Sequence, residues 1–312
     1  MKIKSSLGIP AVLFAVIVWG ISFVSTKIIL NDLPPVTIAF FRQFVALVPL
    51  LILMAIKKES FRIKKGEFLT FLLAALFGIV LYFVCENKGL VLTSASNASM
   101  LVAAIPIFAL VAESVTNRSR LELPSLFCIV ASILGVYFVI FEDGIPDFSS
   151  DSFLGNLLVL GAMVSWILYT FLSKRLGEKY SSLKMTTIQT LMSIPLFAPF
   201  IFSEIGAWKM PSPVGLLNLV FLGVFCSALA YVFYLFGIQA LGPVLPSALL
   251  NLVPVVTIIT GALLLSEDLS GYQILGASLI IGSLTFLSVM KVRKKPNLPS
   301  DEVLNAIDSS IN

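Results

Sequence analysis

Histidine is missing from this 312-residue sequence, and only three cysteines are present. Without histidine, the chain cannot form a Ser-His-Asp triad, a histidine general base, or a metal or haem site that histidine holds. Cys85, Cys128 and Cys226 fall in apolar stretches without a C-x-x-C pair, which favours buried thiols over a redox or metal site. The sequence therefore predicts no metal site, no cofactor and no enzyme activity.

Charged residues are also scarce. They make up 12% of the chain, against about 25% in a soluble domain, while 58% of the residues are hydrophobic. A helix needs ~20 mostly apolar residues to cross ~30 Å of hydrocarbon, whereas a barrel strand needs only ~10. Windows of helical length occur at residues 9–30, 36–56, 67–85, 94–116, 122–141, 153–173, 184–204, 214–236, 243–265 and 271–290. The sequence therefore predicts an all-α membrane protein with ten transmembrane helices.

The distribution of lysine and arginine predicts the orientation of these helices. If both termini are cytoplasmic, nearly all positive charges outside the helices face inward, including the basic loop 57–65. That loop is interpreted as an orientation signal that attracts anionic lipid, in preference to a nucleic-acid site. The acidic segment 142–152 lies between two predicted repeats, 1–145 and 152–292, and a cytoplasmic tail is expected at 296–312.

The chain carries an internal repeat. Pro106 and Pro254 each lie in the middle of an apolar window and are 148 residues apart. Other pairs recur at a separation of 147 or 148 residues: Gly89 and Gly237, Ser99 and Ser247, Trp19 and Trp166, and Lys27 and Lys174. Each predicted repeat holds five helices, and an odd number forces the second copy to enter the membrane in the opposite sense. Inverted repeats of this kind are typical of secondary transporters, whose substrate site lies near the bilayer midplane.

Several residues, with their spacing, form a pattern that resembles a known family. The first window contains W-G-x-S-F-x-x-x-K from Trp19 to Lys27, the second carries Arg42, and Pro254 is followed by Glu267 after the ninth. Over roughly residues 9–290, the chain resembles the EamA family of the drug/metabolite transporter superfamily. The resemblance implies ten helices in an inverted five-plus-five repeat, and transport of small metabolites, often export of amino acids or related compounds.

One position departs from the pattern of that family. The family usually has a glutamate at the end of the fourth helix, where this chain has Ser119. Glu113 lies six residues earlier and is not its equivalent. It shares a helical stripe with Ser99, Ala103 and Pro106, so it is a candidate coupling residue that binds a proton or a cationic substrate. The alternative interpretation is a plain interfacial carboxylate.

Ionisable residues inside the apolar windows cost roughly 2.5–3.5 kcal/mol each on insertion scales, so each calls for an explanation. Arg42 is a candidate anion clamp for a carboxylate or phosphate, or else a structural partner of a helix-end carboxylate. Lys27 is expected to be a solvated or orienting residue near the outer end of its helix. Glu86 is expected in an external loop, and Glu267 at a helix end.

The prolines suggest a polar pathway between the repeats. A proline inside a helix removes one backbone hydrogen bond, which is tolerated where a cavity or polar neighbours are near. Pro106 and Pro254 are therefore candidate hinges. Ser99, Ser247 and Asn251 are candidate substrate-binding residues on the same helices, although close helix packing through small residues is the alternative.

Aromatic residues complete the candidate substrate site. Trp19 and Trp166 are matched residues several positions inside their helices, deeper than an interfacial belt requires. With Tyr231 and Tyr234 they are candidates to stack on a substrate or close a gate, or else they serve packing.

These patterns predict an exporting secondary transporter of small metabolites in the cytoplasmic membrane. Its partners would be a small-molecule substrate and the lipid bilayer, with no nucleic acid, and alternating access would move the substrate. A Walker-type phosphate loop is absent, so ATP is not expected to drive transport directly. Exchange of nucleotide sugars or organic phosphates is the first alternative, and a membrane-embedded enzyme is a remoter one. Substrate, direction, coupling ion and oligomeric state stay open.

Overall fold

A computed structural model describes residues 7–118, 121–141, 145, 147–177, 179–241, 246 and 249–293. Within these ranges every regular element is a helix, which confirms the predicted all-helical class. Seven helices of the described part are long and apolar enough to cross a membrane, and two shorter apolar helices follow near its end.

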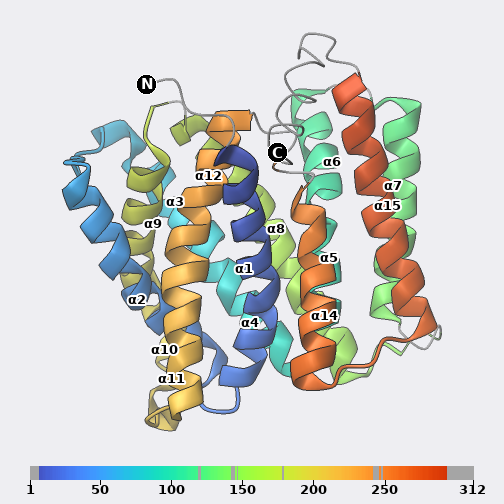
Figure 1. The fold of residues 1–312 in the computed structure, drawn as a ribbon, viewed down its shortest axis with the longest axis horizontal. Coiled ribbons are helices and arrows are strands. Elements are labelled where there is room, and N and C mark those ends of the chain that lie inside the picture. The colour runs from blue at the N-terminus through green and yellow to red at the C-terminus, as the bar shows by residue number, and fades with distance from the viewer. Residues whose placement is uncertain are drawn as a thin grey trace, which may run out of the picture.

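The helices succeed one another with short connections (Figure 1). Their bounds are α1 (Gly8–Ile29), α2 (Pro35–Ile56), α3 (Phe68–Ala75), α4 (Tyr82–Leu92), α5 (Ala95–Ala103), α6 (Ile105–Asn117), α7 (Leu123–Ile140), α8 (Asp151–Gly177), α9 (Ser182–Leu196), α10 (Ala198–Ile201), α11 (Pro213–Val220), α12 (Ala230–Leu241), α14 (Val253–Leu265) and α15 (Gly271–Arg293). Short segments complete them: η2 (Lys65–Glu67), η3 (Leu76–Leu81), η4 (Ile205–Ala207), η5 (Phe221–Leu229) and η6 (Leu250–Leu252).

The helices form one bundle with two distinct ends. Helix α1 begins and α15 ends on one face, at the top of Figure 1, which we call the terminal face; we call the other the opposite face. Helix α1 packs between α12 and α14, while α7 and α15 pair along one edge. Helix α4 packs on α8, and α2 packs on η5, so segments from the two predicted repeats interleave.

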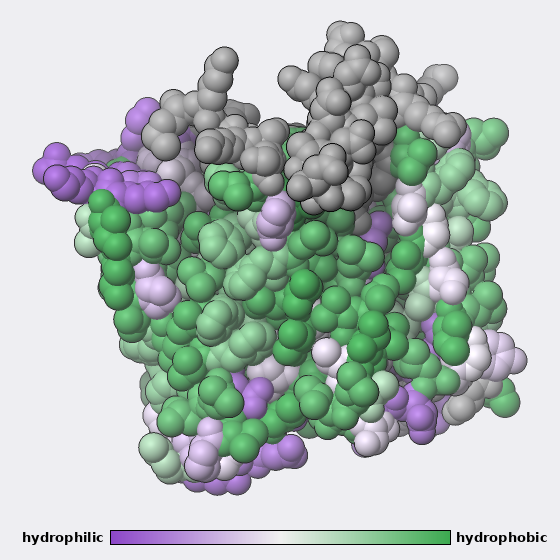
Figure 2. Space-filling view, in the orientation of Figure 1, coloured by the Kyte–Doolittle hydropathy of each residue, from purple (hydrophilic) through white to green (hydrophobic). Residues whose placement is uncertain are grey.

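The surface of the bundle suits a lipid environment. Figure 2 shows hydrophobic side chains over the middle of the molecule, with hydrophilic ones gathered at its upper left and along its lower edge. Large apolar side chains are exposed along α2 and α7, among them Val48, Ile52, Leu126 and Phe127. Exposed apolar area on this scale is a membrane-facing surface.

Both candidate hinge prolines coincide with interruptions of helices. Helix α5 ends at Ala103, and α6 starts with Pro106 in its first turn. In the second repeat, η6 gives way to α14, which has Pro254 in its first turn. Proline lacks the N–H that would continue the previous helix, so the interruption falls just before each proline.

Two π-helical segments also occupy matched positions. Shifted by 148 residues, η3 (76–81) becomes 224–229, which lies inside η5 (221–229). Each segment leads directly into an aromatic-rich helix that contributes to the cavity described below. Single-turn π-helical insertions are rare and occur frequently at functional sites.

Glycine allows two matched helix crossings. At the α4–α8 crossing, a Cβ on Gly89 would lie 2.8 Å from the carbonyl oxygen of Gly155. At the α1–α12 crossing, a Cβ on Gly237 would lie 2.1 Å from a methyl group of Val12 and 3.4 Å from the carbonyl oxygen of Gly8. Gly89 and Gly237 are the pair separated by 148 residues in the sequence. A glycine therefore permits a close helix crossing at the matched position of each predicted repeat.

On the opposite face, Glu267 caps a helix of the first repeat. Its carboxylate accepts hydrogen bonds from the backbone N–H groups of Ala95 at 2.8 Å and Ser96 at 3.0 Å, and from the Ser96 hydroxyl at 2.6 Å. Glu204 caps α2 in the same way, accepting from Thr37 N at 2.7 Å and Thr37 Oγ1 at 2.8 Å. A carboxylate at a helix N-terminus is favourable both as a hydrogen-bond acceptor and in the field of the helix dipole. These two glutamates therefore join the first and second halves of the chain on this face.

The structure corrects the interpretation of Lys27 as a solvated residue. Its ammonium group is half-buried and donates to the carbonyl oxygens of Leu90 at 2.5 Å and Thr93 at 2.6 Å, at the C-terminal end of α4. Unpaired carbonyls at a helix C-terminus favour a cation. Lys27 thus joins α1 to the α4–α5 connection, next to the cap that Glu267 provides.

Removing the Glu267 cap should destabilise the bundle. We expect Glu267→Ala to lower the free energy of unfolding by about 1–3 kcal/mol, because its three donors lose their acceptor. Thermal unfolding of the purified protein in detergent measures this loss. Asp268→Ala is the matched control, since Asp268 is an exposed neighbouring carboxylate, and equal losses in the two variants would refute the capping role.

Candidate functional site

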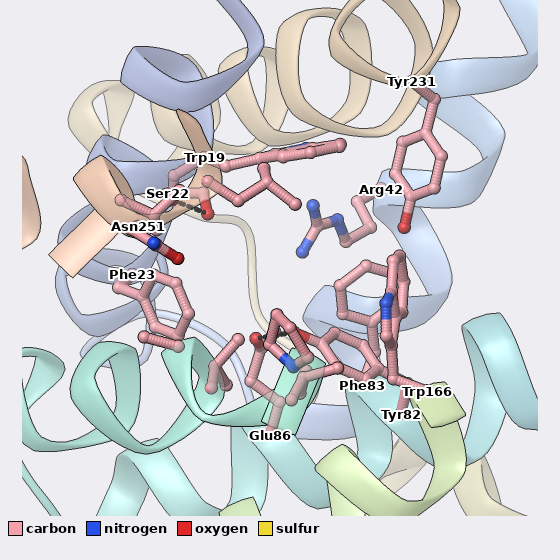
Figure 3. Close-up of a pocket in the computed structure, with 16 residues that line it drawn as sticks. Trp19, Ser22, Phe23, Arg42, Tyr82, Phe83, Glu86, Trp166, Tyr231 and Asn251 are labelled. Atoms are coloured by element: carbon pink, nitrogen blue, oxygen red, sulfur yellow. Dashed lines mark hydrogen bonds between the residues drawn. The ribbon is translucent and has the colours of Figure 1, made fainter. Parts of the chain in front are cut away.

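A cavity of about 120 Å³ lies between segments of the two predicted repeats (Figure 3). Side chains from α1, α2, α4 and the α5–α6 interruption line one part of it, and side chains from α8, α12, η6 and the start of α14 line the rest. A cavity of this volume has room for several water molecules or a small polar compound. Predominantly apolar walls with a few polar groups are typical of small-molecule sites.

The cavity brings together most of the residues that the sequence singles out. Its walls include Trp19, Arg42, Trp166, Tyr231 and Asn251, and also the candidate hinge residue Pro106. Residues more than 230 positions apart in the chain therefore meet at one place. The side chain of Asn251 is 6% exposed, and Figure 3 shows it across the cavity from Arg42.

Three other candidates are not among the residues that line the cavity. Ser99 is completely buried, and its hydroxyl donates to the carbonyl oxygen of Ser96 at 2.8 Å. Tyr234 packs against Trp19 with the ring centroids 5.3 Å apart. Pro254 is buried at the start of α14. Direct substrate contact is therefore not visible for Ser99 or Tyr234, and Tyr234 supports the wall through Trp19.

Two candidates fall outside the described part of the chain. Ser247 belongs to a stretch that the structure does not describe, and for Glu113 only the backbone, within α6, is described. Their proposed roles therefore stay predictions.

Arg42 is held in place without a carboxylate partner. Its side chain is 3% exposed, Nε donates to Ser227 Oγ at 2.9 Å, and Nη2 donates to the carbonyl oxygen of Leu222 at 3.5 Å. The guanidinium carbon lies 4.1 Å from the centroid of the Phe83 ring. No carboxylate of the described residues comes within 4.0 Å of it, so the alternative of a pair with a helix-end carboxylate is wrong for this part of the chain. An arginine has five N–H donors, which leaves three available to a ligand.

The aromatic residues form a continuous wall around Arg42. The Trp19 indole donates to the carbonyl oxygen of Cys226 at 3.0 Å, which anchors it to η5. The Trp19 and Tyr231 rings are 5.3 Å apart, and Trp166 contacts Tyr82 at 5.1 Å. Because these rings come from α1, α4, α8 and α12, a ligand beside Arg42 would contact both repeats.

Glu86 is the principal residue that the sequence interpretation missed. The expectation of an external loop is wrong: Glu86 lies in α4, is 6% exposed and lines the cavity. The apolar window ends at residue 85, but the helix continues to Leu92 with Lys88 exposed on a different face. The Tyr82 hydroxyl donates to Glu86 Oε1 at 2.7 Å.

The repeat itself points to the face of α4 that carries Glu86. Shifted by 148 residues, Tyr231 and Tyr234 correspond to Phe83 and Glu86. Applying the repeat offset to the aromatic candidates would therefore have pointed to Phe83 and Glu86. Ser22 and Phe23, which also line the cavity, belong to the W-G-x-S-F motif of the first window, whereas Tyr82 carries no comparable signal.

The sequence matches a known family of transporters. The profile described as the EamA-like transporter family matches the chain twice, over residues 6–141 and 153–289. The chain belongs to the EamA-like transporter family. The two matches agree with a unit that occurs twice in the chain.

Relatives of this EamA-like transporter carry transport names. It is 29% identical over 265 residues to an "Uncharacterized transporter" of Archaeoglobus fulgidus, covering 84% of this chain and 92% of that one. It is 28% identical over 306 residues to the "Uncharacterized transporter YcxC" of Bacillus subtilis, covering 94% and 96%. It is 29% identical over 292 residues to a "Probable amino-acid metabolite efflux pump" of Escherichia coli, covering 90% and 94%.

A solved structure shares the fold of this EamA-like transporter. A protein of known crystal structure aligns with a TM-score of 0.65 at 16% identity, over 93% of this chain and all of that one. At this identity the likeness shows the fold alone.

Proposed function

We propose that this EamA-like transporter is a secondary transporter that exports amino acids or related small metabolites across the cytoplasmic membrane. The cavity between the repeats carries the proposal, because it combines a buried arginine with free donors and aromatic walls from both repeats. The export of amino-acid compounds rests on the name of the Escherichia coli relative. An organic-phosphate exchanger would favour a second cation beside Arg42, but Lys27 is engaged with backbone carbonyls away from the cavity wall.

The proposed transport cycle is alternating access. Ten transmembrane helices, as two inverted five-helix repeats at 1–145 and 152–292 with cytoplasmic termini, would rock about the cavity. The interruptions before Pro106 and Pro254 support hinge roles for both prolines, because each leaves a helix without continuous hydrogen bonding. Glu113 is retained as a candidate coupling residue.

Comparing the metabolites of cells with and without the protein tests the proposed function. Compounds that accumulate in cells lacking the transporter are then loaded into proteoliposomes containing the purified protein, and their movement is followed. Protein-dependent movement of at least one small amino or carboxyl compound is expected. The absence of any such movement, with protein shown to be folded and inserted, would refute the function.

Changing the cavity wall should impair transport. We expect Trp19→Ala and Asn251→Leu each to reduce the initial transport rate on the order of 10-fold, because one removes an aromatic contact and the other a polar contact. Initial rates in proteoliposomes measure the effect. Ile17→Ala and Leu252→Ala are matched controls, since both side chains are exposed neighbours outside the cavity. Normal transport by both wall variants would show that the cavity is not the substrate site.

A further inference from the structure

Two side chains of opposite charge line the same cavity without forming an ion pair. Arg42 is 3% exposed and Glu86 is 6% exposed, and no nitrogen–oxygen pair between them lies within 4.0 Å. Figure 3 shows the guanidinium reaching into the cavity, with the Glu86 side chain below it in the view. A buried charge without an opposite partner is costly. Keeping two such charges apart therefore calls for a functional reason.

Both residues line the cavity and keep unused hydrogen-bonding capacity. Arg42 uses one N–H on Ser227 and one on the Leu222 carbonyl, which leaves three donors. Glu86 accepts one hydrogen bond from Tyr82 on Oε1, and its other oxygen accepts none from the described residues. The protein thus offers a donor fork on one side of the cavity and a carboxylate oxygen on the other.

The space between the two charges has aromatic walls. Phe83 lies under the guanidinium, while Trp19, Trp166 and Tyr231 close the sides. Aromatic faces attract an ammonium group and also accept an apolar side chain. The cavity volume of about 120 Å³ restricts the occupant to a small molecule.

The two charged side chains have no charged counterparts in the second predicted repeat, although Trp19 and Phe83 are matched there by Trp166 and Tyr231. Shifted by 147 residues, Arg42 corresponds to Gln189, and shifted by 148 residues, Glu86 corresponds to Tyr234. The second repeat therefore supplies neutral side chains at both equivalent positions. A ligand with one positive and one negative group would accordingly bind in one orientation.

We infer that the cavity takes zwitterionic substrates, with Arg42 binding the carboxylate and Glu86 binding the ammonium group. This inference rests on the proposed transport function and narrows its substrate class. Charge-assisted hydrogen bonds of this kind are the strong ones, and a bidentate arginine–carboxylate contact also orients the ligand. A compound that lacks either charge would leave one buried group unpaired and would bind more weakly.

Matched ligand series test the inference. Leucine, 4-methylpentanoate and 3-methylbutylamine share one apolar skeleton, as do phenylalanine, 3-phenylpropanoate and 2-phenylethylamine, and they differ in carrying both charges or only one. Binding to the purified full-length protein is followed by tryptophan fluorescence, since Trp19 and Trp166 line the cavity, and transport is followed in proteoliposomes. The wild-type protein is expected to prefer each zwitterion over both of its analogues on the order of 10-fold.

Glu86→Gln should remove the preference for zwitterions over acids, a change that misfolding would not produce. The variant is expected to lose affinity for the zwitterions on the order of 10-fold while binding the acids as well as the wild type does, so that its preference disappears. Lys88→Gln is the matched control, because Lys88 is an exposed charge on the same helix, and it should keep the wild-type preference. A partly unfolded variant would lose both ligands equally.

The outcomes separate this inference from the transport function. Equal binding of acids and zwitterions by the wild-type protein, or equal losses of both in Glu86→Gln, would overturn the zwitterion site while leaving transport intact. Transported metabolites that carry only one charge would do the same. If no amino or carboxyl compound moves at all, the proposed function fails and the zwitterion site fails with it.

Discussion

Arg42→Gln is expected to reduce transport about 100-fold, the largest loss for any single substitution in the cavity wall. Glutamine keeps a polar group of similar reach but removes the positive charge and most of the N–H donors. The guanidinium N–H groups that are not bonded to Ser227 or Leu222 are then lost, and Ser227 loses the partner that now holds it at 2.9 Å. The initial rate in proteoliposomes, with the leading compound from the metabolite comparison, measures this effect.

Arg42→Lys separates charge from geometry. Lysine keeps the positive charge but not the planar fork, so an intermediate loss is expected if the substrate carboxylate is held by two donors. If both variants transport every compound at the wild-type rate, Arg42 does not bind the substrate. Thermal unfolding should accompany these measurements, because Arg42 also contacts Phe83 and η5.

Gly89→Leu is expected to prevent α4 from packing on α8. A Cβ at Gly89 would already lie 2.8 Å from the backbone oxygen of Gly155, and a backbone atom cannot rotate away as a flexible side chain can. Leucine adds three further carbons, so we expect a loss of about 3 kcal/mol or more in the free energy of unfolding. Reduced yield of monodisperse protein and a lower unfolding temperature in detergent would report it.

Gly66→Leu is the matched control for this crossing. A Cβ at Gly66 has no heavy atom within 4 Å, so stability should be unchanged. The matched substitution Gly237→Leu, at the α1–α12 crossing of the other repeat, should resemble Gly89→Leu. Equal stability of Gly89→Leu and Gly66→Leu would show that the close crossing is not required.

Much of the candidate site follows from the repeat. Because Trp19 and Trp166 occupy matched positions, the sequence predicts that they belong to one site, and the structure places both on the cavity wall. The helix interruptions at Pro106 and Pro254 are predictable for a similar reason, since the missing N–H of proline acts locally. Ser99 does not line the cavity, because a small hydroxyl can bond its own helix instead, as Ser99 does with the carbonyl oxygen of Ser96.

Glu86 shows where hydropathy stops being informative. A window average ends the third helix where Glu86, Asn87 and Lys88 lower its apolar content. A hydropathy average cannot tell that Glu86 faces the interior while Lys88, two residues later, faces outward. That separation depends on the rotation of α4, which the π-helical segment η3 alters just before it.

The sequence by itself determined the membrane environment, the helical class, the duplicated unit and the family. These properties are carried by composition, segment length and spacing, which act locally or add along the chain. Only the tertiary structure decided that Arg42 lacks a carboxylate partner, that Lys27 and Glu267 bind helix ends, and that Glu86 faces the cavity. Such contacts join residues far apart in the chain, so they depend on how the helices rotate and cross. Because the interior is close-packed, the rotation of one helix depends on that of its neighbours.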